Sequence, residues 1–171
     1  MKELGIKKLN QNNWLEPDAS LSFSVSDLFD KIYKAKLDDS VPIEIHKLFE
    51  TARGTMIYGY FFYPIFSFSA EQFTRIAEAA ISKACDILDA PKQKTFSEKI
   101  KWLTKFPEIK NTSHDRWKSL RELRNKFSHP SKLTIITPYM AIRLMEQIAD
   151  DINYIFKCTI HIKSAKQKEI F

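Results

Sequence analysis

Two side chains that could act together on a phosphate group stand five positions apart in "LRELRNKFSHP", residues 120–130. Arg124 is a permanent cation with several N–H donors, and His129 belongs to the residue type that titrates near neutral pH. A guanidinium can oppose charge on phosphoryl oxygens while an imidazole exchanges a proton with a reacting oxygen. The segment therefore predicts acid–base chemistry on a phosphodiester, with the amide of Asn125 as a third polar group.

A helix must position these residues. We expect it to begin at Thr112 or Ser113 and to end at His129, because Pro130 disfavours helical geometry in the residue before it. Asn125 and His129 are four positions apart and are therefore neighbours on the helix surface. The free carbonyl groups at the end of a helix favour the cationic form of a histidine.

The apolar side of this helix also holds the arginine. A helical wheel places four large side chains in one sector: Trp117, Leu120, Leu123 and Phe127. Arg124 lies in the same sector, so we expect it to face the core. A buried guanidinium needs a carboxylate, several carbonyl groups or a second subunit. Glu71 and Glu78 are the candidate carboxylates.

One geometric difficulty separates the two key residues. On a regular helix Arg124 and His129 point about 140° apart. They can share one substrate if the helix unwinds before Pro130, or if a second copy of the helix faces the first across a twofold axis. The sequence favours neither arrangement over the other.

The rest of the chain predicts helices. Only three glycines occur in 171 residues, and most of the seven prolines stand between periodic segments. Helix starts are expected near Ser24 or Ser26, at Pro42, at Ser69 with Gln72, at Thr95 with Glu98, and at Thr137 with Pro138. The second of these helices should run to about Tyr63, where Pro64 closes it. With the helix that carries Arg124, six segments result.

We therefore expect an all-α fold, an antiparallel helical bundle of about five to six helices. Its domain organisation should comprise an irregular N-terminal arm (1–24), the helical bundle (25–158) and a basic C-terminal tail (159–171). This length suits one domain with a single core.

Composition limits the class of protein and its compartment. The net charge of +6 is compatible with a phosphate-bearing partner, although scattered surface lysines give the same sum. Cys85 and Cys158 fall on amphipathic segments without nearby ligands, so buried free thiols are favoured over a disulfide or a zinc site. No secretory signal or membrane span is apparent, and we expect a cytoplasmic protein without a cofactor or bound metal.

The segment "RNKFSH" resembles the signature of the HEPN superfamily, in which an arginine is followed after four residues by a histidine. The residue after the arginine is commonly asparagine there, as Asn125 is here. The resemblance covers about residues 40–158. It implies a HEPN-like helical bundle that forms a homodimer around the motif helices and, in many members, a metal-independent endoribonuclease.

The resemblance also implies a role for each motif residue. Arg124 would stabilise the transition state, His129 would exchange the proton, and Asn125 would orient the histidine or the RNA. The ribose 2′-hydroxyl would attack and leave a cyclic phosphate end. Members of the superfamily serve as toxins, antiphage effectors or partners of nucleotidyltransferases, so an antitoxin or a nucleotidyltransferase is an implied partner. Other members have lost activity and only bind.

Basic side chains surround the motif. Arg121, Lys126 and Lys132 are candidates for binding the RNA backbone, because cationic side chains supply most of the affinity for phosphates. Arg121 can equally belong to the solvent-facing side of its helix.

The motif also has a purely structural interpretation. Arg124 can form an ion pair with Glu71 or Glu78, while His129 bonds nearby carbonyl groups at the helix end. On that interpretation the chain is a non-catalytic, HEPN-like dimeric interaction or ligand-binding module.

Overall fold

A computed structural model describes residues 6–92, 95–127 and 136–168 of the chain. Within these ranges the chain is helical and contains no strand, which confirms the predicted all-α bundle. The elements are α1 (Val25–Lys34), α2 (Ile43–Ile57), the short 3-10 helix η1 (Tyr58–Tyr60), α3 (Ile65–Ile87), α4 (Phe96–Leu103), α5 (Pro107–Phe127) and α6 (Pro138–Lys168). Residues 6–24 form turns and irregular backbone before α1.

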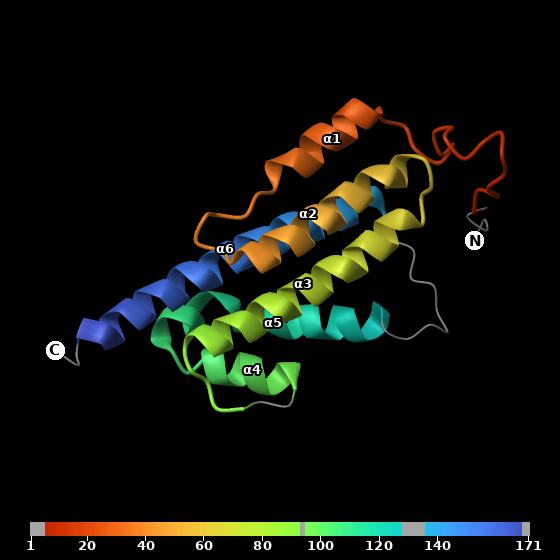
Figure 1. Cartoon of the computed structure of the whole chain (residues 1–171). Helices are drawn as coiled ribbons and strands as arrows, with labels where there is room; N and C mark the ends of the chain where they lie inside the picture. The colour runs from red at the N-terminus through yellow and green to blue at the C-terminus, as the bar shows by residue number, and fades with distance from the viewer. Residues whose placement is uncertain (1–5, 93–94, 128–135, 169–171) are drawn as a thin grey trace.

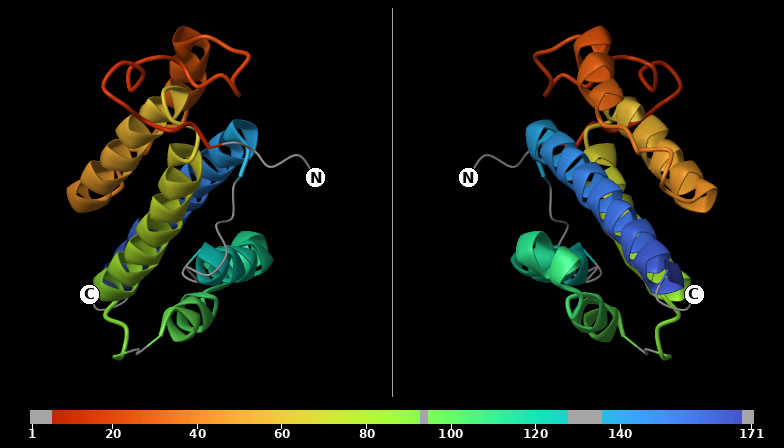
Figure 2. Two further views of the ribbon diagram at one scale, coloured as in Figure 1. Left: turned by 90° about the vertical axis from the view of Figure 1, so that its right-hand side faces the viewer. Right: turned by 90° about the vertical axis from the view of Figure 1, so that its left-hand side faces the viewer.

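The two long helices α3 and α6 lie side by side at the centre, with α1 and α2 on one side and α4 and α5 on the other (Figures 1 and 2). Helix α2 runs antiparallel to both α1 and α3 (Figure 1). The central pair is different, because α3 and α6 run in the same direction. At their shared starting end, the backbone N–H of Ile136 donates to Oγ of Ser67 over 3.0 Å.

Apolar side chains from all six α-helices form one core. The largest fully buried side chains include Phe49, Phe66, Phe73, Trp117 and Phe156. Four alanines of α3 are completely buried: Ala70, Ala77, Ala80 and Ala84. Small side chains let neighbouring helices approach closely, which suits a central helix that contacts α2, α4, α5 and α6.

Several expected helix starts are confirmed. Ser24 and Asp27 form a reciprocal capping box at α1, and Thr95 and Glu98 do so at α4. At the start of α6, Oγ1 of Thr137 accepts from the N–H of Met140 over 3.2 Å. Each cap satisfies backbone N–H groups that have no partner inside the helix.

Three other boundaries differ from the expected ones, and prolines set two of them. Pro64 caps α3, which begins at Ile65 and not at Ser69, and α2 ends at Ile57 before the short turn that precedes this proline. Pro107 begins α5 five residues ahead of the expected cap at Thr112. Proline suits a first helical turn because its missing N–H would have no helical partner there. Ser69 is instead buried inside α3.

The last helix is longer than the sequence indicated. We expected the bundle to end at residue 158, but α6 continues to Lys168. Thr159 and Ile162 stay buried along this extension, so the core-facing side of the helix does not end at 158. None of the described helices combines the length and apolar character required to cross a membrane.

Both cysteines, Cys85 and Cys158, are buried and unpaired, as predicted. Burial raises the pKa of the Cys85 thiol to about 11; the charge of Lys99 opposes this rise, and that of Asp86 adds to it. A thiol with so high a pKa stays protonated at neutral pH and is a poor nucleophile.

Candidate functional site

The helix that carries the motif, α5, is held to the bundle by the side chains expected to do so. Trp117 and Leu120 are buried, Phe127 is half-buried against the core, and Leu123 is half-buried. Their side of α5 faces α3 and α6, and α4 packs against the same helix. This packing fixes how the polar residues in the last turns of α5 are presented.

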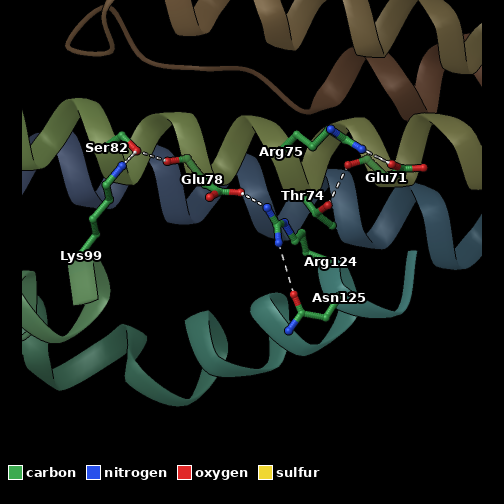
Figure 3. A network of polar contacts seen from close by, with 8 residues as sticks. All are labelled: Glu71, Thr74, Arg75, Glu78, Ser82, Lys99, Arg124 and Asn125. Carbon is green, nitrogen blue, oxygen red and sulfur yellow. Dashed lines mark hydrogen bonds and ion pairs between the residues drawn. The ribbon is translucent and has the colours of Figure 1, made fainter. Parts of the chain in front are cut away.

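Arg124 forms an ion pair with Glu78 of α3, with 3.2 Å between Nη2 and Oε2 (Figure 3). The other expected partner, Glu71, pairs with Arg75 at 2.6 Å. The Arg124 side chain is 38% exposed and that of Glu78 is 29% exposed. The expectation that Arg124 faces the core is therefore wrong. A long side chain can carry its charged end to the edge of a helix interface.

Asn125 lies beside the arginine. Nη1 of Arg124 donates to Oδ1 of Asn125 across 3.4 Å, which is a long hydrogen bond. The side chains of Asn125 and Lys126 are exposed. The structure therefore brings Arg124 and Asn125 together at an accessible edge between α3 and α5. His129 and Lys132 lie outside the described residues.

A row of polar groups continues from Glu78 along α3 toward α4 (Figure 3). Oγ of Ser82 donates to the backbone carbonyl of Glu78 over 2.9 Å and accepts from Nζ of Lys99 over 2.7 Å. This row joins three helices beside the motif. The sequence analysis missed Ser82 and Lys99, although the four-residue spacing from Glu78 to Ser82 indicated a shared helix side.

Arg121 points toward α4. Its Nη1 donates to Oγ of Ser97 over 2.9 Å, and its Nε is buried without a hydrogen-bond partner among the described residues. Arg121 is half-buried and therefore does not belong to the fully solvated side of α5.

A second ion pair joins α5 to α6. Nη2 of Arg116 lies 2.9 Å from Oδ1 of Asp151, whose side chain is only 11% exposed. Burial raises the pKa of Asp151 to about 6; Arg116 opposes this rise and Asp150 adds to it. Beside the pair lies a cavity of about 320 Å³ between the two helices. The sequence analysis missed this carboxylate, although it directly precedes Ile152 of the apolar stripe.

Among the described residues, no three His, Cys, Asp or Glu side chains cluster in a way that could hold a metal ion. No protein-family model matches the chain, and comparisons with curated proteins and with solved structures give no match.

Proposed function

We propose that the protein is a HEPN-like, metal-independent endoribonuclease that acts as a homodimer through Arg124, Asn125 and His129. The observation that carries this proposal is the placement of Arg124: its guanidinium is partly exposed, touches the Asn125 amide and is held by Glu78 from the opposite side. A cation tethered at an accessible edge can meet a phosphate without first leaving a buried position.

The proposed reaction is a transfer within the RNA strand. The ribose 2′-oxygen forms a bond to phosphorus while the bond from phosphorus to the neighbouring 5′-oxygen breaks. The 2′-hydroxyl proton passes to the imidazole of His129, and the leaving 5′-oxygen takes up a proton from solvent water. Arg124 stabilises the negative charge on the phosphoryl oxygens, and Asn125 orients the phosphate or the imidazole. The products are a cyclic phosphate end and a 5′-hydroxyl end.

A cleavage assay tests this proposal. Purified wild-type protein with excess chelator should cut single-stranded RNA and leave cyclic phosphate ends, whereas Arg124→Gln should lower the rate by about 10²–10³-fold. His129→Ala should abolish cutting. Arg143→Gln is a matched control, because it removes an arginine that pairs with Glu146 on α6 and should leave the rate unchanged. Equal cutting by wild type and His129→Ala would contradict the proposal.

Mixing two inactive variants tests the homodimer. If Arg124 of one subunit and His129 of the other form one site, a dimer of Arg124→Gln with His129→Ala contains one intact site. Random exchange of subunits should then restore about a quarter of the wild-type activity, because half of the dimers are mixed and each has one of two sites. If both residues come from one subunit, mixing restores nothing, and the shared site is ruled out.

A toxin or antiphage role, which the resemblance also implies, predicts an effect on the host cell. Expression of the wild-type chain should arrest growth, while His129→Ala at the same protein level should not. Growth arrest by both proteins would point to a cause other than RNA cleavage.

One observation favours a second candidate function, a non-catalytic dimeric interaction or ligand-binding module. The ion pair between Arg124 and Glu78 joins α5 to α3 and gives the arginine a structural role. On this alternative, Arg124→Gln and Glu78→Gln cause equal losses of stability or of dimerisation, and neither the wild type nor a variant cuts RNA.

A further inference from the structure

A small pocket with an unusual charge lies between α4 and α5, next to the motif. It measures about 290 Å³ and is lined by Ser97, Ile100, Lys101, Lys118 and Arg121. Three of these five residues are cationic, and none of them is acidic. The Lys101 and Lys118 side chains are exposed at its rim, and Arg121 is half-buried.

Among the described residues, no carboxylate forms an ion pair with these cations. Of the six arginines in the chain, Arg121 alone makes no ion pair with a described residue; each of the others pairs with an aspartate or glutamate. The same holds for Lys101 and Lys118 within the described ranges. Glu98 stands in the first turn of α4, but its carboxylate accepts from the N–H of Thr95 and does not line the pocket.

The arginine also has unused hydrogen-bonding capacity. Oγ of Ser97 accepts one bond from Nη1, while the buried Nε has no partner among the described residues. A buried N–H without an acceptor costs free energy that an incoming oxygen would recover. A fork of guanidinium donors, two ammonium groups and a hydroxyl together match an anion with several oxygens, as a phosphate group has.

The size of the pocket limits what part of a ligand can enter. Pockets for whole small molecules usually measure about 300–1,000 Å³, so this one lies just below that range. It has room for a phosphate group, while the attached sugar and base remain outside. The other parts of a ligand must therefore lie along the surface of α5.

We propose that this pocket binds a backbone phosphate of the RNA strand and fixes the position of that strand relative to Arg124. This inference rests on the proposed function, because it places the strand along α5. Arg121 and Arg124 are three residues apart, about 4.5 Å along the helix axis. Arg121 reaches toward α4 and Arg124 toward α3, so one strand that follows α5 passes both groups.

Binding of a strand that cannot be cut tests the pocket. A labelled 2′-O-methyl oligoribonucleotide lacks the attacking hydroxyl, so its affinity can be measured whether or not the protein is a nuclease. The double variant Lys118→Gln with Arg121→Gln should bind it at least about tenfold more weakly at low salt. The salt dependence of log Kd should also become shallower by about 0.7, the value for one phosphate contact on a single strand.

The matched control is Lys157→Gln with Lys163→Gln. These two lysines are exposed on α6 and do not line the pocket, and their replacement removes the same two charges. Control and wild type should differ by less than about twofold. Equal weakening in both double variants would overturn the proposal, because general surface charge would then explain binding. The single variant Lys118→Gln should also weaken binding of the oligonucleotide, by a smaller factor. Lys118 is exposed, so this test remains valid even if Arg121→Gln impairs folding.

Three outcomes separate this inference from the proposed nuclease function. Loss of affinity in the pocket variant without cutting by the wild type supports the pocket and contradicts the nuclease. Cutting by the wild type and by the pocket variant with the same KM supports the nuclease and overturns the pocket. Inorganic phosphate that binds as tightly as the oligonucleotide would overturn an RNA strand as the ligand.

Discussion

Arg116 and Arg124 leave the same helix eight residues apart, and each reaches a carboxylate on one of the two central helices. Arg116 meets Asp151 of α6 at 2.9 Å, and Arg124 meets Glu78 of α3 at 3.2 Å. The carboxylates differ in their surroundings. Asp151 is almost fully covered by protein, whereas Glu78 keeps more than twice as much of its side chain in contact with solvent.

This difference separates a structural pair from a pair that can exchange partners. A covered carboxylate pays a desolvation cost that its partner only partly offsets, which is why the pKa of Asp151 rises to about 6. An accessible pair contributes little to stability, and water or a phosphate can replace either member. The same residue types on one helix therefore suit opposite roles.

The largest expected effect tests whether apolar packing, and not either ion pair, holds α5 in place. Trp117 follows Arg116 in the sequence, and its side chain is almost completely buried in the core. Trp117→Ala should reduce the free energy of unfolding by about 3–5 kcal/mol, through lost burial and the cavity left behind. Chemical denaturation measures this loss. A reduction below about 1 kcal/mol would mean that the ion pairs carry the attachment.

The pH dependence of protein stability tests whether the carboxyl group of Asp151 is as strongly desolvated as its burial indicates. Its pKa is about 6 in the folded protein against an ordinary value of 3.8, so folding favours the protonated form. The stabilising contribution is full below about pH 3.8 and is lost as the pH rises through 6. The difference corresponds to about 3 kcal/mol at most. The variant Asp151→Asn should lack this loss between pH 4 and 7.

The neighbouring Asp150 provides the control. It is exposed, and Asp150→Asn should preserve most of the pH dependence, with the midpoint slightly lower because one negative charge beside Asp151 is gone. Other carboxylates act in the opposite direction. Burial tends to raise the pKa of Asp18, but hydrogen bonds from Tyr63 and Ser20 outweigh it and lower that pKa. The comparison must therefore be made between variants; parallel curves for wild type and Asp151→Asn would contradict the assignment.

Replacement of Arg116, the partner of Asp151, should have a smaller effect on the free energy of unfolding. At pH 7, Arg116→Gln leaves a covered carboxylate without its cation and should cost about 1–3 kcal/mol of stability. The cost should shrink at lower pH, as Asp151 takes up a proton. Unfolding by denaturant at pH 5 and pH 7 gives both values, and a cost that does not change with pH would contradict this account.

The smallest effect is expected at the accessible pair. Glu78→Gln should change stability by less than about 1 kcal/mol, because both side chains already contact solvent. If this variant instead destabilises the protein as much as Arg116→Gln does, the pair between Arg124 and Glu78 is structural. The second candidate function would then be preferred.

The sequence predicted the class of fold and some local structure well, because these depend on short-range signals. The capping boxes at Ser24 and Thr95 work within four residues of chain, and both are present. The capping pattern at Ser69 was misleading. Pro64 begins α3 earlier, so the backbone N–H groups that Ser69 could have capped already lie inside the helix. One proline can end a turn and begin the next helix, which local spacing does not reveal.

For the candidate site, the sequence named Glu78 as one of two partners for Arg124, because both glutamates lie on the helix that precedes α4. It did not identify the burial of Asp151 or the pocket around Arg121. Both features depend on how α5 packs against α6 and α4, and helical periodicity within one segment does not specify this. The expectation that Arg124 enters the core failed because the wheel gives a direction and ignores side-chain length.

The parallel arrangement of α3 and α6 also has a consequence for synthesis on the ribosome. The contact between Ser67 and Ile136 spans 69 positions, so the side of α3 that packs against α6 has no permanent cover until α6 has emerged. Pairings so distant along a chain form slowly, and exposed apolar helices aggregate while they wait. Chains that terminate before α6 should therefore depend on chaperones or be degraded.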